Sequence, residues 1–335
     1  MAEQEMNKAL SEEERLKQMA AQMRAREYQG LSEEEIQERE RQKEMRRKKN
    51  IAILEDTLAV LEQGGYLKDG QEARLPFSPE QMREIQVFLP EELASLGTAK
   101  PEEPQTQGNP CTFGCENEDA LVLAQKQYQS LKNAEDPTPN ILVLNLASAT
   151  RPGGRTRDGA SAQEEDLCRR TSLLLSLESE GAKRYYDYNN ARKTRMGSDG
   201  VMLSPNVAVL KDASSEMLSQ PFPISVMSCA APMVRMGLEG MSQQAYEAML
   251  CKRIQGMLLV AASQGYRHLI LGAFGCGVYG NDATLVSDLF ARGIREFSYA
   301  GKGSGALFDS IRFAVLCRPG KDYNYREFCR NFSCG

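Results

Sequence analysis

The chain has 335 residues, of which 41% are hydrophobic, and its formal net charge is −5. The hydrophobic share suffices for a buried core, in one large domain or in two ordinary ones. The negative charge argues against a dedicated nucleic-acid binder, because phosphate binding normally requires an excess of Lys and Arg on one face. An anionic ligand would therefore have to be held by a local arrangement of groups.

The nine cysteines are an odd number, and no two of them have the Cys-x-x-Cys spacing. No secretory hydrophobic segment precedes them, so we expect reduced thiols in a cytosolic or nuclear protein. The pairs Cys111/Cys115 and Cys329/Cys334 lack the further Cys or His ligands typical of zinc sites, and we predict no metal. The single histidine, His268, lies at the start of an apolar run and is expected to be structural. No apolar run reaches the roughly 20 residues that cross a bilayer, which predicts a soluble protein.

Residues 1–50 are rich in Glu, Lys, Arg, Gln and Met, and LSEEE occurs twice, at Leu10–Glu14 and Leu31–Glu35. In each copy the serine can be an N-cap and the last glutamate can complete a capping box, which predicts an exposed pair of helices. The basic run Met45–Lys49 is either a solvated helix end, which we favour, or a patch for nuclear import or an anionic partner. We expect residues 1–50 to be a charged helical extension that is dispensable or binds a partner.

The pattern changes at Ile51, where apolar residues lie on one helical face until two glycines end the helix. A short helix is predicted to start at Ser78-Pro79, and the run GTAKPEEPQTQGNP, residues 97–110, is typical of a linker. We therefore expect an accessory helical segment and linker over residues 51–110, with a domain boundary near Pro110. The apolar face and the glycines that define this helix are Ile51, Leu54, Leu58, Leu61, Gly64 and Gly65.

Beyond Pro110, segments with helical periodicity alternate with apolar, strand-like runs. Strands that are apolar on both faces and separated by helices indicate an α/β sheet with both faces covered. In such sheets ligands lie at the carboxyl ends of the strands. Helices are predicted at residues 119–131, 162–177, 242–264 and 282–296, and strands at 140–148, 199–211, 223–232, 268–275 and 308–316.

Two glycine-rich loops follow predicted strands. The first is ASATRPGGRTRDGASA, residues 147–162, and the second is GAFGCGVYGN, residues 272–281. Glycines let a ligand approach the backbone closely, and unpaired N–H groups at a helix start can face an anion. Glycine turns are also common after strands for purely structural reasons. Two such loops together predict a cradle for a diphosphate.

The first loop leads directly into Gln163-Glu164-Glu165. Adjacent residues on a helix point about 100° apart, so Glu164 and Glu165 are not expected to face each other as a glycosidase carboxylate dyad does. Either they have different roles, or both only complement the dipole at the helix N-terminus.

This arrangement resembles the poly(ADP-ribose) glycohydrolases of the bacterial type, whose catalytic unit is a macrodomain. Their signature is two or three glycines, a gap of six to eight residues and then Gln-Glu-Glu, and here GGR is followed by seven residues and QEE. The resemblance covers about residues 51–320. It implies an α/β macrodomain-like mixed sheet flanked by helices. With the boundary near Pro110, we expect the macrodomain-like glycohydrolase domain at 111–335, preceded by the N-terminal helical extension. It also implies hydrolysis of ribose–ribose O-glycosidic bonds to release ADP-ribose, without a cofactor or a metal.

The resemblance further implies roles for individual residues. Glu165 would be the catalytic acid, and Glu164 would bind ribose hydroxyls. Tyr279 would lie near the adenine or the ribose, and Asp119 near the adenine. The ADP-ribose ligand set would be Gly153, Gly154, Arg155, Gln163, Gly275, Cys276, Gly277, Val278, Tyr279 and Asp119.

The sequence departs from the family pattern at two positions. Arg155 stands where a third glycine is expected, and Arg151 stands where an asparagine usually precedes the proline. The arginine at 155 could clamp the diphosphate or crowd its approach. We favour the clamp, so that Arg155→Ala would weaken ADP-ribose binding.

The expected partners are poly(ADP-ribose) and ADP-ribosylated proteins, with ADP-ribose as product ligand, in the DNA damage response. We expect a monomer that binds neither a membrane nor a specific nucleic-acid sequence. Two alternatives remain open at this point. One is a non-catalytic ADP-ribose reader, and the other is a hydrolase of mono-ADP-ribosylated targets.

Overall fold

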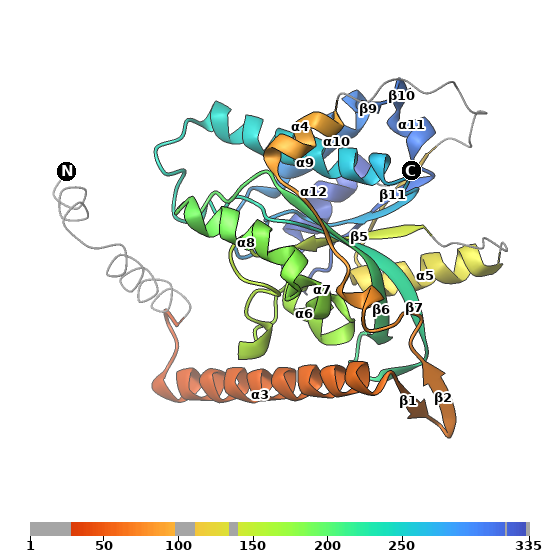
Figure 1. Ribbon diagram of the computed structural model, residues 1–335. Helices are drawn as coiled ribbons and strands as arrows, with labels where there is room; N and C mark the ends of the chain where they lie inside the picture. The colour runs from red at the N-terminus through yellow and green to blue at the C-terminus, as the bar shows by residue number, and fades with distance from the viewer. Residues whose placement is uncertain (1–27, 98–110, 134–139, 319, 333–335) are drawn as a thin grey trace. The chain divides into compact units, whose positions relative to one another are not determined.

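A computed structural model describes residues 28–97, 111–133, 140–318 and 320–332 (Figure 1). The chain divides into two compact units, residues 1–49 and 50–335. The helices are α3 (Glu33–Gln63), α4 (Pro90–Leu96), α5 (Ala120–Asn133), α6 (Gln163–Arg170), α7 (Leu173–Leu177), α8 (Glu180–Ala191), α9 (Gln243–Ser263), α10 (Ala283–Glu296), α11 (Ser304–Leu307) and α12 (Tyr323–Phe332), with short 3-10 turns η1 (Gln81–Arg83) and η2 (Thr156–Asp158). The strands are β1 (Gly65–Lys68), β2 (Gln71–Arg74), β3 (Gln86–Phe88), β4 (Thr112–Glu116), β5 (Ile141–Leu146), β6 (Val201–Lys211), β7 (Met217–Cys229), β8 (His268–Leu271), β9 (Ser298–Tyr299), β10 (Lys302–Gly303) and β11 (Ser310–Ala314).

The second unit is built on a seven-stranded mixed sheet in the order β3-β6-β7-β5-β8-β11-β4. The strands from β7 to β4 are parallel to one another, whereas β3, β6 and β7 pair antiparallel. This is the macrodomain-like mixed sheet that the resemblance implied. Because β3 belongs to the sheet, residues 50–97 and the predicted macrodomain are parts of one compact unit.

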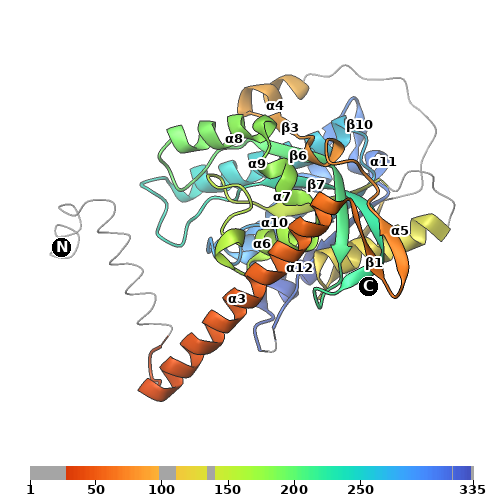
Figure 2. The same cartoon turned by 60° about the horizontal axis from the view of Figure 1, so that its bottom comes forward.

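Helices cover both faces of this sheet, as the two views show (Figures 1 and 2). Leu142 and Leu144 of β5 pack with residues of α9, α10 and α12, whereas Ile141 and Val143 pack with α5, α6 and α7. Successive side chains of a strand point to opposite faces, so a strand between two helical layers must be apolar throughout. The prediction from the apolar runs is thereby confirmed.

The structure corrects several predicted boundaries. Helix α3 is one continuous helix through Gln63 rather than two, and it starts with the predicted capping box between Ser32 and Glu35. It ends where predicted, at Gly64, whose φ is +77°. The predicted helix after Ser78 is only the 3-10 turn η1. The first LSEEE copy and most of the predicted linker lie outside the described residues.

The helix predicted at 162–177 is broken into α6 and α7. At the break, Ser172 N donates to Ala208 O and Ala208 N donates to Ser172 Oγ, both at 2.9 Å. These bonds to β6 compete with helix continuation, since a short polar side chain can satisfy the backbone outside a helix. The helices α8 and α12 were not predicted. In the described part of the chain, no helix is both long and apolar enough to cross a membrane.

Candidate active site

A pocket of about 880 Å³ lies at the carboxyl ends of β5, β7, β8 and β11. It is walled by the first glycine-rich loop, the start of α6 and residues that follow the other three strands. This is the edge at which the parallel-sheet argument placed a ligand. The lining residues are Leu146, Ser148, Thr150, Arg151, Gly154, Arg155, Asp158, Ala160, Ser161, Ala162, Glu164, Glu165, Met233, Val278, Tyr279 and Arg318.

The carboxylates of Glu164 and Glu165 both reach Gly154. A Cβ at Gly154 would lie 2.5 Å from Glu165 Oε1 and 2.9 Å from Glu164 Oε2. Gly154 also has φ +59°, a region that residues with a side chain rarely adopt. The two side chains start from adjacent positions on α6, yet both carboxylates approach Gly154 of the preceding loop. Adjacent helix positions do point about 100° apart, but that spacing did not predict that both carboxylates would approach the same glycine.

The carboxylate of Glu165, at the start of α6, binds both ends of the loop that precedes this helix. Its Oε1 accepts a hydrogen bond from Arg155 N at 3.0 Å, and its Oε2 accepts one from Ala162 N at 2.9 Å. The second bond is the half of a capping box in which the third residue of a helix reaches back to the N-cap amide. Both carboxylate oxygens are thus fixed by backbone groups at the two ends of one loop, residues 155–162. The side chain lies in the pocket wall in a defined orientation.

Glu164 is held from the other side. Ser148 N donates to its Oε2 at 2.7 Å, and Asn145 Nδ2 donates to its Oε1 at 3.2 Å. Burial raises the pKa of Glu164 to about 8, against the opposing effect of these two hydrogen bonds, and the neighbouring Glu165 raises it further. The raised pKa favours the protonated form of Glu164 at neutral pH, in contrast to an ordinary surface glutamate.

Glu164 should make the stability of the protein depend on pH. Its pKa is raised from 4.5 to about 8 by folding, so the folded protein retains a proton that the unfolded chain loses between these values. This stability is fully present below the unfolded pKa and is lost as pH rises through the folded pKa, at about 1.4 kcal/mol per pH unit. We expect the free energy of unfolding to fall less between pH 5 and 9 in Glu164→Gln than in the wild type. Urea denaturation at several pH values tests this, and parallel profiles would contradict it.

Gln163 and Asp119 do not line the pocket. The Gln163 side chain donates to Leu144 O at 2.7 Å and accepts from Leu146 N at 2.8 Å, which ties the start of α6 to the end of β5. Asp119 accepts from the first amides of α5 and lies 3.0 Å from the buried guanidinium of Arg170. The polar groups of these two side chains thus bind other parts of the protein, whereas both residues were expected from the sequence to bind ADP-ribose.

The second glycine-rich loop contributes Val278 and Tyr279 to the pocket, whereas Gly275, Cys276 and Gly277 are not among the residues that line it. Gly275 has φ +72°, and a Cβ there would collide with Asn281 and Ala231. The Arg235 side chain stabilises the loop by donating to Gly277 O and Val278 O at 2.8 Å each. Burial raises the pKa of Tyr279 to about 12, so its hydroxyl stays protonated in the pocket.

The guanidinium of Arg155 lies at the pocket rim. Its Nε donates to Asp158 Oδ2 at 2.9 Å, and Arg151 lies 3.7 Å from the same oxygen. Two cations therefore share one carboxylate there. The backbone N–H of Arg155, as described, already holds Glu165, so this residue takes part in the site through its main chain as well as its side chain.

Sequence reasoning missed several pocket residues. Asn145 does not line the pocket itself but donates to Glu164, and it had a signal, since it is a fully buried polar residue inside an apolar strand. Ser148 lies two residues after the end of that strand and could have been found by its position. Met233 and Arg318 follow β7 and β11 at the same edge, but nothing in their neighbouring sequence marks them as pocket residues.

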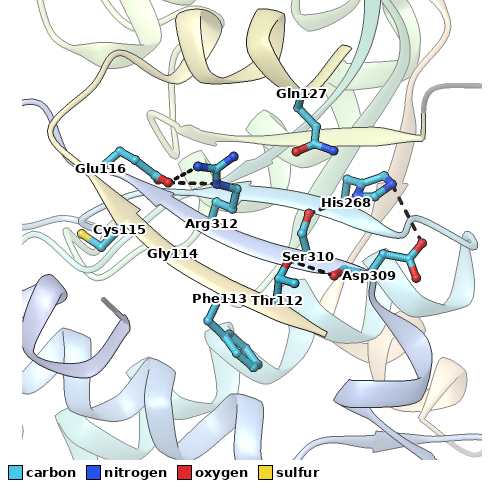
Figure 3. Close-up of a pocket in the computed structure, with 10 residues that line it drawn as sticks. All are labelled: Thr112, Phe113, Gly114, Cys115, Glu116, Gln127, His268, Asp309, Ser310 and Arg312. Carbon is cyan, nitrogen blue, oxygen red and sulfur yellow. Dashed lines mark hydrogen bonds and ion pairs between the residues drawn. The ribbon is translucent and has the colours of Figure 1, made fainter. Parts of the chain in front are cut away.

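A second cavity, of about 500 Å³, lies over β4, β8 and β11 and contains the single histidine (Figure 3). His268 Nδ1 is 3.0 Å from Ser310 Oγ, and its Nε2 is 3.9 Å from Asp309. The charged groups here pair within the protein, because Arg267 binds both oxygens of Asp309 and Arg312 binds Glu116. This agrees with a structural histidine and favours the pocket at Glu164 and Glu165 as the functional one.

Comparisons with known proteins agree with this geometry. The family model described as "Microbial-type PARG, catalytic domain" matches residues 54–212. The poly(ADP-ribose) glycohydrolase (PARG) of Thermomonospora curvata is similar in structure, with a TM-score of 0.75 and 28% identity over 85% of this chain and 99% of that chain. The PARG of Deinococcus radiodurans in complex with ADP-ribose has a TM-score of 0.65 and 29% identity over 77% and 98% of the two chains. A comparison with curated protein sequences gave no match.

Proposed function

Since the chain belongs to the microbial-type poly(ADP-ribose) glycohydrolases, we propose that it hydrolyses the ribose–ribose O-glycosidic bonds of poly(ADP-ribose) with Glu165 as the catalytic acid. The observation that carries this assignment is the convergence of both carboxylates on Gly154 in one pocket at the strand ends. The T. curvata enzyme has also been solved with the inhibitor ADP-HPD, at a TM-score of 0.72.

Each group in the pocket has a part in this reaction. Glu165, as a carboxylic acid, gives its proton to the glycosidic oxygen while the bond from that oxygen to the anomeric carbon breaks. A water molecule then attacks the positively charged ribose, and the Glu165 carboxylate takes up the proton that this water loses. Glu164, whose raised pKa favours its protonated form at neutral pH, donates a hydrogen bond to a ribose hydroxyl. It adds no second negative charge beside the Glu165 carboxylate that the proton transfer leaves.

The loops hold the diphosphate between them. Gly154, with Gly153 before it, brings the backbone of the first loop close to the phosphates. Val278 approaches them from the second loop, whose turn at Gly275–Gly277 supports it. Tyr279 offers a protonated hydroxyl and an aromatic ring to the adenosine side. Gln163 and Asp119 act indirectly in this proposal, since their side chains orient α6 and α5 rather than the ligand.

Incubation with labelled poly(ADP-ribose) tests the proposed activity. Release of ADP-ribose by the wild type supports the glycohydrolase, whereas retention of the intact polymer would indicate a reader. The same assay with singly ADP-ribosylated protein separates polymer hydrolysis from mono-ADP-ribosyl hydrolysis. We expect the polymer to be the better substrate, with ADP-ribosylated proteins as the carriers of the polymer, and a monomeric enzyme in the cytosol or nucleus.

Arg155 is proposed to bind the diphosphate by exchanging its contact with Asp158 for the ligand. The contact with Asp158 is exposed to solvent and is therefore weak, whereas a charge-assisted bond to phosphate is worth about 1.5 to 3 kcal/mol. We expect Arg155→Ala to weaken ADP-ribose binding about tenfold at low salt, with a smaller loss at high salt. Titration calorimetry at two salt concentrations measures this. Tighter binding by Arg155→Gly would instead show that the arginine obstructs the site.

A further inference from the structure

Asn50 lies far from the pocket in sequence, yet its side chain contacts the loop whose two ends bind the Glu165 carboxylate. It is the first residue of the second compact unit and is 8% exposed. Its Nδ2 donates to Gly159 O at 2.9 Å and to Ala160 O at 3.3 Å. The family model match begins at residue 54, so Asn50 lies outside the matched range.

The contacted carbonyls lie in the middle of the loop whose two ends bind Glu165. Arg155 N and Ala162 N, at those ends, donate to the two carboxylate oxygens of Glu165. Between them the chain turns at Gly159, with φ +73°. The loop therefore has two sets of anchors, the Glu165 carboxylate on the pocket side and the Asn50 amide on the side of α3.

Arg169 reinforces the second anchor. It is 3% exposed, and its Nη1 donates to Ala160 O at 2.5 Å. Thr57 lies about two turns further along α3. Its hydroxyl donates to Arg169 O at 2.5 Å and so joins α3 to the backbone of α6. Asn50 and Thr57 thus make buried polar contacts from one helix, but only Asn50 reaches the loop.

We infer that Asn50 is a positioning residue, which sets the orientation of the Glu165 carboxylate by fixing residues 155–162. Without its N–H groups, Gly159 O loses the bond described above, and Ala160 O loses one of its bonds while keeping the one from Arg169. The loop can then shift, and Arg155 N and Ala162 N shift with it. A displacement of about 1 Å in a catalytic group can lower the rate about 100-fold. The inference rests on the proposed hydrolase function, because it concerns the orientation of the acid.

The test compares Asn50→Ala and Asn50→Asp with Thr57→Val, using poly(ADP-ribose) hydrolysis, ADP-ribose binding and thermal unfolding. We expect both Asn50 variants to lose about 10- to 100-fold in kcat and to bind ADP-ribose within about threefold of wild type. In Asn50→Asp, kcat relative to wild type should recover at low pH, where a protonated carboxyl can again donate to a carbonyl. Thr57→Val should lower Tm as much as Asn50→Ala while keeping kcat within about twofold.

Three results would overturn the inference. The first is wild-type kcat in both Asn50 variants. The second is an equal loss of kcat in Thr57→Val at an equal loss of Tm, since Asn50 would then act only through overall stability. The third is a wild type that binds ADP-ribose but releases none from the polymer, which would overturn the proposed function as well. An active wild type with unaffected Asn50 variants would overturn this inference alone.

Discussion

Glu165→Gln should lower kcat for poly(ADP-ribose) hydrolysis about 10³-fold and leave ADP-ribose binding within a few fold of wild type. The amide cannot give a proton to the leaving oxygen, and proton transfer by a positioned acid typically contributes 10² to 10⁴ in rate. The change is nearly isosteric, so the side chain still fills the space beside Gly154. Single-turnover kinetics and titration calorimetry measure the two quantities.

The control for this variant is Glu180→Gln, an exposed glutamate in the first turn of α8. It makes the same change of side chain without touching the pocket and should hydrolyse at the wild-type rate. A glutamine at 165 can accept only one of the two amide hydrogen bonds, so Tm is measured as well. Substantial turnover by a folded Glu165→Gln protein would remove Glu165 from the role of acid.

Gly154→Ala should reduce activity at least 100-fold. The added Cβ would lie 2.5 Å from Glu165 Oε1 and 2.9 Å from Glu164 Oε2, so one or both carboxylates must move, and a misplaced catalytic group costs about that factor. The φ of +59° adds a backbone cost of about 1 to 2 kcal/mol for a residue with a side chain. Both kcat and Tm should therefore fall.

Gly305→Ala provides the matched control, because a Cβ at Gly305 would meet no atom within 4 Å and its φ is not positive. This variant should keep the activity and stability of the wild type. If Gly154→Ala lowered Tm but hydrolysed normally, the close approach of the two carboxylates to Gly154 would have no catalytic importance.

The amino-acid sequence by itself determined the features that depend on neighbouring residues. The capping box at Ser32 and the caps at Ser242 and Asp282, which accept from amides three residues on, start helices where the pattern predicts them. Apolar runs gave the strands of the covered sheet, because each strand is buried on both faces. The spacing from Gly153-Gly154 to Gln163-Glu164-Glu165 indicated the family, since the motif lies within one short segment.

Only the tertiary structure decided what those motif residues contact. It brought both carboxylates to Gly154 and bound the Gln163 side chain to the backbone of β5. It placed Arg318 in the pocket, although Arg318 lies about 150 residues after Glu165 in the chain. It also placed Asn50, predicted as the end of a dispensable extension, against Gly159 and Ala160. Contacts between residues more than a hundred positions apart depend on how helices pack on the sheet, and no local propensity or spacing encodes which polar side chain will meet which carbonyl.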